Sequence, residues 1–122
     1  MQKKTVILGA SPNPARYAYT AAQMMTEKTV DFVPLGIKKG VIFGEKILDL
    51  GKRPIIEDVH TITLYIGPQN QPEWYDYVLS LNPKRVIFNP GTENKEFMEL
   101  LEENHIQVIS ACSLVMLSSG QF

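Results

Sequence analysis

The chain has 122 residues, of which 44% are hydrophobic, and its 12 basic and 13 acidic side chains leave a formal net charge of −1. This size and composition predict one globular domain over residues 1–122 and argue against a disordered chain. A charge so close to zero gives no electrostatic footprint for nucleic acid. No run of about 18 apolar residues is present, so we expect neither a membrane span nor a secretory signal. The single cysteine, Cys112, fits a reducing compartment, and these features together favour a cytoplasmic location.

Short apolar segments alternate with helical patterns along the chain. The segments that predict strands lie at 5–8, 30–35, 54–56, 61–66, 85–88 and 107–110. The first of them is apolar on both sides, as in a parallel strand that is buried on both faces. Helices are expected at 15–28, 72–81 and 93–103, with a short closing helix that covers a sheet edge within 111–122. We interpret 41–53 as an irregular crossover containing a short helical turn or a hairpin.

This alternation demands parallel strands joined by right-handed crossovers. It therefore predicts a Rossmann-like, doubly wound α/β fold, with a mainly parallel sheet of five to six strands and helices on both faces. Two residues mark the predicted helix ends. Pro72 suits the first turn of the helix over 72–81, and Asn104 stands where a left-handed residue should end the helix over 93–103.

Ligands of such sheets bind outside the carboxyl ends of the strands, where the strand order reverses. After the first strand, Gly9 permits a tight turn, and Ser11 and Asn13 offer short polar side chains. The helix that follows directs its free N–H groups at the same place, which predicts a phosphate or pyrophosphate site with Arg16 as an anion clamp. Only one glycine of the G-x-G-x-x-G pattern is present. The alternatives are a turn that only caps a structural helix and a solvated Arg16.

The loop after the second strand is basic. A nicotinamide-binding domain usually has an acidic residue here to hold the adenosine ribose, but the sequence has Pro34-Leu35-Gly36 followed by Lys38 and Lys39. Two cations favour a ligand with an additional phosphate on its ribose, such as coenzyme A or NADP, and argue against NAD. A solvated lysine pair on a surface loop is the alternative.

Two later strands end in turns with glycine, at Gly67-Pro68 and at Asn89-Pro90-Gly91, and these turns allow the backbone to approach a flat or extended ligand. Each could also be a simple strand-to-helix turn. The predicted cofactor-binding residues are Gly9, Ala10, Ser11, Asn13, Arg16, Gly36, Lys38, Lys39, Gly67, Pro68, Asn89 and Gly91.

In this order the segments resemble a known family, the small CoA-binding proteins related to the nucleotide-binding domain of the succinyl-CoA synthetase alpha subunit. Residues 6–14 (VILGASPNP) resemble the family's opening V-V-G-A-S-x-x-P, and residues 33–55 are similar to its V-x-P-x-x-x-x-x-G…G-x-P-V segment. Residues 88–96 resemble its W-x-Q-x-G-x-x-N-x-E stretch, and 108–112 its V-V-x-D-R-C ending. The resemblance covers nearly the whole chain and implies a Rossmann-like fold that binds coenzyme A or an acyl-CoA.

The chain departs from the family pattern at several positions. Phe88 and Pro90 stand in place of the Trp and Gln, and Ser110-Ala111 in place of the Asp-Arg. These departures keep a scaffold with a decayed nucleotide site as one alternative function, beside an NADP-dependent reductase-like enzyme. A homodimer, or a complex with an unidentified protein partner, also stays open.

We expect no catalytic residues. His60 and His105 are placed before a strand and after a helix, on the side away from the ligand edge, and we interpret Cys112 as a buried structural cysteine. No His, Cys or carboxylate spacing suits a metal site.

Overall fold

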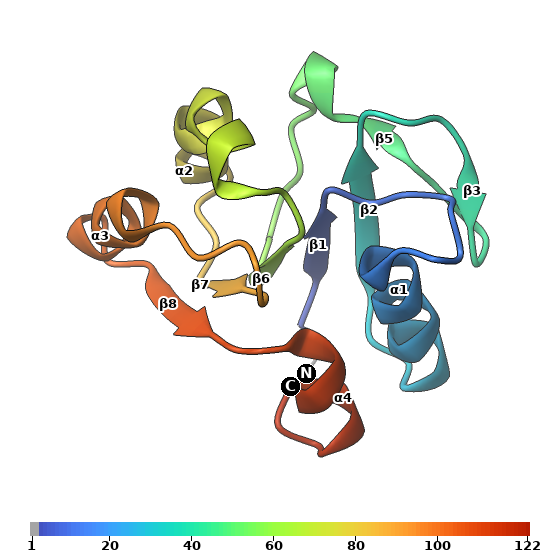
Figure 1. Ribbon diagram of the computed structural model, residues 1–122. Coiled ribbons are helices and arrows are strands. Elements are labelled where there is room, and N and C mark those ends of the chain that lie inside the picture. Colours follow the sequence, from blue (N-terminus) through green and yellow to red (C-terminus); the bar gives the residue numbers. More distant parts are fainter. Residues whose placement is uncertain (1–2) are drawn as a thin grey trace.

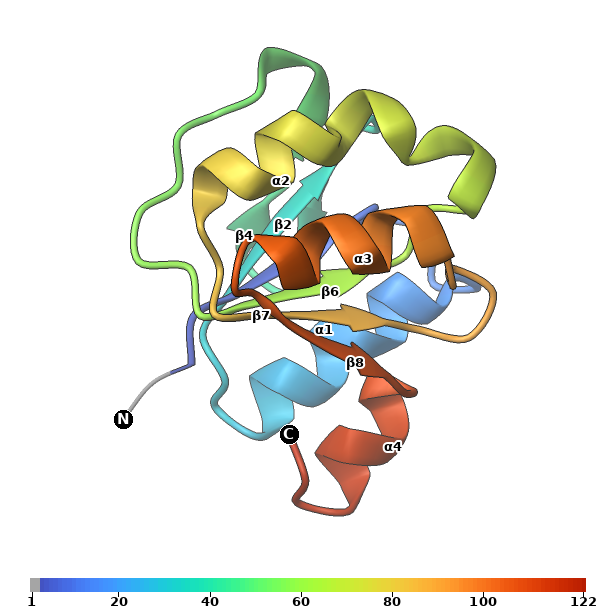
Figure 2. The same ribbon diagram turned by 90° about the vertical axis from the view of Figure 1, so that its left-hand side faces the viewer.

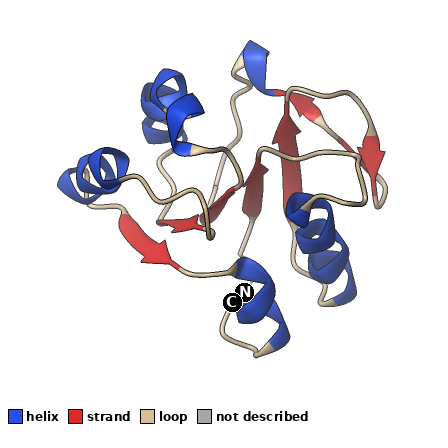
Figure 3. Ribbon diagram, in the orientation of Figure 1, coloured by secondary structure: helices blue, strands red, loops and turns tan. Residues whose placement is uncertain are grey.

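Six parallel strands form the sheet at the centre of the computed structural model, which describes residues 3–122 (Figures 1 and 3). The strands are β1 (Thr5–Leu8), β2 (Phe32–Gly36), β5 (Leu48–Asp49), β6 (Thr61–Leu64), β7 (Arg85–Phe88) and β8 (Gln107–Ser110). Their order across the sheet is β5-β2-β1-β6-β7-β8, and every neighbouring pair is parallel. The predicted Rossmann-like fold is confirmed.

Two helices cover each face of the sheet, as Figure 2 shows. They are α1 (Tyr17–Glu27) and α4 (Ser113–Ser118) on one face, and α2 (Tyr75–Leu81) and α3 (Lys95–Glu103) on the other. The α2–α3 face holds the larger apolar cluster, in which Phe88 packs edge-to-face on Phe97 at a centroid distance of 5.6 Å. On the other face the small side chains Ala18, Ala21 and Ala22 bring α1 close to the sheet. None of the helices described is long and apolar enough to cross a membrane.

The crossover after β2 contains the hairpin that was one of its two predicted forms. β3 (Val41–Ile42) pairs antiparallel with β4 (Glu45–Lys46) around the turn residues Phe43 and Gly44. Both turn residues have positive φ, 48° and 83°, as a two-residue type I′ hairpin requires.

The strand predicted at 54–56 is wrong. β5 lies earlier, at Leu48–Asp49, and a 3₁₀ turn over Leu50–Lys52 follows it. Pro54 has no N–H to donate to a neighbouring strand, and Ile55 is 92% exposed, so this segment continues as irregular chain.

The later elements agree with the sequence, except that β6 ends two residues earlier and α3 begins two residues later than predicted. There are three further differences. Two 3₁₀ turns, Pro68–Asn70 and Pro72–Trp74, precede α2. α3 ends at Glu103 as predicted, but its C-cap Asn104 has φ −98°, and the left-handed residue is His105 at 63°, one position later than predicted. α4 packs against α1 on a face of the sheet rather than over its edge.

Candidate functional site

The strand order reverses between β1 and β6, because the chain runs outward from β1 to β2 and β5 and then returns to β6. Gly9 follows β1 at this point with φ +99°. A Cβ on Gly9 would lie 3.0 Å from the backbone C and O of Tyr65, which follows β6. Glycine is therefore required here by its conformation and by the contact between the two strand ends.

The loop between β1 and α1 is shaped by its own polar side chains. Ser11 Oγ accepts a hydrogen bond from Asn13 N at 3.1 Å, and Asn13 Oδ1 accepts one from Ala15 N at 3.0 Å. Both side chains act as acceptors in these bonds, so the Ser11 hydroxyl proton and the Asn13 amide protons are left to donate outward. The N–H of Ala10 is not available, because it donates to Leu35 O at 3.1 Å.

The start of α1 carries further free donors. Arg16 is the N-cap residue, and its side chain makes no capping hydrogen bond. Among residues 3–122, no acceptor is found for the N–H groups of Ser11, Tyr17 and Ala18. Free N–H groups at the first turn of a helix attract anions.

The two lysines lie beside this loop because the glycines around them pack against it. A Cβ on Gly36 would stand 2.3 Å from Ala10 O, and one on Gly40 would stand 2.9 Å from Pro12 Cβ. The chain between these two contacts carries Lys38 and Lys39, both exposed. Figure 1 shows the loop after β1 running past the end of β2 toward β3 before it reaches α1.

The only ion pair within residues 3–122 joins Lys95 and Glu99 at 3.9 Å. Arg16, Lys38 and Lys39 therefore have no carboxylate partner in the part of the chain described. Together with the donors of Ser11 and Asn13, they form a surface of hydrogen-bond donors and cations, which we call the donor edge. The diphosphate and the ribose phosphate of coenzyme A are acceptors and anions, so the donor set fits that ligand.

The other half of the carboxyl edge, after β6 and β7, is different. Gln71 is 1% exposed, and its Nε2 donates to Ile66 O and to Thr92 O, both at 2.8 Å. Gln71 Oε1 accepts from Asn94 Nδ2 at 2.9 Å. One side chain therefore joins the two loops that follow β6 and β7.

Asn89, which the sequence analysis predicted to bind a cofactor, makes internal hydrogen bonds with its whole side chain. Its Nδ2 donates to Thr63 Oγ1 at 2.8 Å and to Leu64 O at 2.9 Å, and its Oδ1 accepts from Ser113 N at 2.8 Å. Asn89 is 3% exposed. We call Gln71, Asn89, Thr92 and Asn94 the locked network, because their amide and hydroxyl groups bond to one another, to neighbouring backbone or to nearby side chains.

The predicted glycines of this half, Gly67 and Gly91, both lie in turns of the chain. Gly91 has φ +92° and no atom within 4 Å of an added Cβ, and its N–H donates to Glu93 Oε1 at 2.8 Å. Gly67 has φ −61° and precedes Pro68 at the first position of a 3₁₀ turn. The conformations of these residues are accounted for by the local chain.

Tyr65 was missed by the sequence analysis, although it directly follows β6. Its hydroxyl is buried, and among residues 3–122 it has no hydrogen-bond partner, since the nearby Thr63 and Ser113 hydroxyls bond to each other at 2.8 Å. Burial raises the pKa of Tyr65 to about 12, so this hydroxyl stays neutral. The strand was predicted over 61–66, which placed Tyr65 inside it, whereas β6 ends at Leu64.

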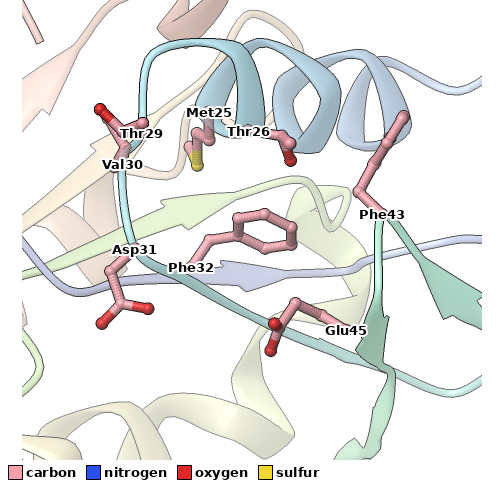
Figure 4. A pocket seen from close by; sticks show the side chains of 8 residues that line it. All are labelled: Met25, Thr26, Thr29, Val30, Asp31, Phe32, Phe43 and Glu45. Atoms are coloured by element: carbon pink, nitrogen blue, oxygen red, sulfur yellow. The ribbon is translucent and has the colours of Figure 1, made fainter.

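Two surface hollows lie away from this edge. The first, of about 420 Å³, is lined by the end of α1, the start of β2 and the β3–β4 hairpin (Figure 4). The second, of about 440 Å³, lies between the end of α1, α4 and Lys3. Neither is lined by the loops after β1, β6 or β7. Within residues 3–122, no three His, Cys, Asp or Glu side chains are grouped to hold a metal ion.

Comparisons with known proteins identify the family and the fold. The family described as CoA binding domain matches residues 3–118. The crystal structure of an uncharacterized protein, 55% identical, covers 100% of this chain and 99% of its own with a TM-score of 0.95. A protein from Thermus thermophilus, 25% identical, covers 99% of this chain and 91% of its own with a TM-score of 0.85. A hypothetical protein from Pyrococcus horikoshii OT3, 23% identical, has the same fold, with a TM-score of 0.82 over 97% of this chain and 83% of its own. None of the curated proteins matches the chain.

Proposed function

The chain belongs to the family of CoA binding domains, and we propose that it binds coenzyme A or an acyl-CoA at the donor edge without catalysing a reaction. The diphosphate would lie on the loop after β1, against Ser11, Asn13 and the first turn of α1, with Arg16 beside it. The ribose phosphate would lie against Lys38 and Lys39. The observation that carries the proposal is this set of donors and cations without partners among the described residues.

The histidines are remote from this edge. His60 and His105 precede β6 and β8, at the amino ends of the strands, whereas the donor edge lies at the carboxyl ends. Cys112, half-buried at the start of α4, lies on the side of the locked network. The two histidines and the cysteine thus lie away from the donor edge, which supports a role in binding rather than in catalysis.

The test is a calorimetric titration of the ligand-free protein with coenzyme A and with dephospho-coenzyme A, which lacks only the ribose phosphate. We expect dephospho-coenzyme A to bind roughly 5- to 30-fold more weakly, since charge-assisted hydrogen bonds contribute about 1–2 kcal/mol at such a site. In Lys38→Ala/Lys39→Ala the two ligands should bind equally. A matched double variant, Lys28→Ala/Lys84→Ala, removes the same charge at the amino ends of the strands and should keep the difference.

NADP and NAD are the comparison ligands. The lysine pair would also suit the ribose phosphate of NADP, so tighter binding of NADP than of coenzyme A would favour the reductase-like alternative. If none of these ligands binds, the donor edge no longer binds the ligand of its family.

A further inference from the structure

The hollow at the far end of α1 has a chemistry opposite to that of the donor edge. Its polar side chains are Thr26, Thr29, Asp31 and Glu45, and no lysine or arginine lines it. The Thr26 hydroxyl donates its proton to Ala22 O at 2.8 Å, and the Thr29 hydroxyl donates its own to Lys28 O at 2.7 Å. Every polar side chain of the hollow is therefore left as an acceptor.

The two carboxylates have no cationic partner in the part of the chain described, where the one ion pair joins Lys95 and Glu99. Asp31 and Glu45 are both exposed, and Figure 4 shows their carboxylates on the side of the Phe32 ring that is away from α1. A ligand here must supply hydrogen-bond donors and positive charge.

The rest of the hollow is apolar. Met25 and Phe32 are almost fully buried and form its floor, and Val30 closes one end. Phe43 lies at the other end, 38% exposed, with its ring held by Tyr19 at a centroid distance of 5.0 Å. A volume of about 420 Å³ is within the range of small-molecule sites.

Phe43 is an unexpected residue at its position. It has φ 48° in a two-residue hairpin turn, where asparagine, aspartate or glycine is preferred and a bulky side chain is strained. Strain of this kind at an exposed aromatic residue is a reason to look for a function. An aromatic face beside two carboxylates attracts organic cations.

We propose that this hollow is a second ligand site, which takes a primary ammonium group carried on an apolar stem. The ammonium would bind between Asp31 and Glu45, and the stem would lie along Phe32 toward Phe43. The 11 residues of α1 separate this site from the donor edge by about 16 Å, so an anion and a cation would bind at opposite ends of one helix.

The test is a titration of ¹⁵N-labelled protein followed by amide chemical shifts, with 2-phenylethylamine as the probe. Its neutral and anionic counterparts, 2-phenylethanol and 3-phenylpropionate, have closely similar stems. We expect shifts concentrated at residues 25–32 and 43–45, and binding of the amine roughly fivefold tighter than of the alcohol, since each exposed carboxylate adds up to about 1 kcal/mol. The Asp31→Asn/Glu45→Gln variant should bind the amine no better than the alcohol.

The control variant Asp76→Asn/Glu102→Gln removes the same charge from exposed positions on α2 and α3 and should leave amine binding unchanged. The proposal is overturned by absent or scattered shifts, by equal binding of the amine and the alcohol, or by an equal loss in both double variants. Because no coenzyme A is present, each of these outcomes is independent of the function proposed for the donor edge.

Discussion

The two halves of the carboxyl edge use similar sequences for different purposes. After β1 and β2, the cations and many of the polar donors have no partner among the described residues, and they face outward. After β6 and β7, the polar side chains of the locked network are buried, or half-buried for Asn94, and are bonded to one another or to neighbouring groups. Both halves contain turns of Gly, Pro and Asn, and we propose that the first half binds the ligand.

The difference shows that a polar residue after a strand is a site candidate only when its hydrogen bonds are not already used. Asn13 is the fifth residue after β1, and Asn89 directly follows β7. Asn13 is exposed and uses one acceptor, whereas Asn89 is 3% exposed and uses both ends of its amide. Substitutions of bonded side chains after β6 and β7 should therefore lower stability. Substitutions of unbonded side chains after β1 and β2 should weaken ligand binding.

The largest effect should come from Asn89→Ala. It removes three buried hydrogen bonds, which Asn89 makes with Thr63 Oγ1, Leu64 O and Ser113 N. We expect the free energy of unfolding to fall by roughly 3 kcal/mol, since each buried group left unsatisfied costs about 1–3 kcal/mol. Urea denaturation measures this change. Asn70→Ala, at an exposed position, should cost less than about 0.5 kcal/mol, and similar losses in both variants would contradict the assignment.

Gly36→Ala should have the next largest effect and acts on the donor edge. The new Cβ would lie 2.3 Å from Ala10 O, so the backbone must move. We expect a loss of roughly 2 kcal/mol of stability together with weaker binding of coenzyme A, because the lysine loop would shift. Gly91→Ala, where only a positive φ opposes the side chain, should reduce stability by about 1 kcal/mol without weakening binding. Calorimetry and urea denaturation of both variants separate the two effects.

Arg16→Ala should change binding alone. The side chain is exposed and makes no capping bond, so its removal should alter stability by less than about 0.5 kcal/mol. Loss of one cation beside the diphosphate should weaken coenzyme A binding about three- to fivefold. Lys28→Ala, at the other end of α1, is the control. An unchanged affinity in Arg16→Ala would place the diphosphate elsewhere.

The smallest effect should be a pH dependence at the amino ends of the strands. Burial and the neighbouring charges of Arg85, Lys3 and Lys84 lower the pKa of His60 below 6.5. The folded protein therefore binds this proton less readily than the unfolded chain. The contribution of neutral His60 to the free energy of unfolding is fully present above pH 6.5. It is lost as the pH falls from 6.5 toward the lowered value.

Thermal unfolding at pH 7.5 and 5.5 tests this dependence. His60→Gln should show a smaller fall in Tm between the two pH values than the unmodified protein, and His105→Gln should show the same fall. An identical fall in His60→Gln would remove His60 as a cause.

The sequence predicted the fold well because the strands depend on local patterns. The runs at 5–8, 85–88 and 107–110 match β1, β7 and β8 in both bounds. β1 and β7 are buried along their whole length, as strands covered on both faces of a parallel sheet are, whereas β8 is a partly exposed edge strand. The misplaced strand at 54–56 shows the limit, because β5 has only two residues and its pairing with Leu35 and Gly36 depends on the tertiary structure.

The site was predictable only in part. The sequence places Asn89 and Lys38 at the same edge, but it cannot show that Asn89 is bonded to β6 and to α4, which begins 24 residues later. The close contact of Gly36 with Ala10 is likewise a long-range feature. Tyr65 was missed because its buried hydroxyl has meaning only once α4 is placed over it.

The most direct test of the difference between the two halves is a titration of ¹⁵N-labelled protein with coenzyme A, followed by amide chemical shifts. If the donor edge binds the ligand, the largest shifts will be at Ser11, Tyr17 and residues 38–40, and Gln71 and Asn94 will change little. Largest shifts at Gln71, Asn94 and Gly91, with Ser11 and Lys38 unchanged, would mean that the locked network is the binding surface and that the assignment of the two halves is reversed.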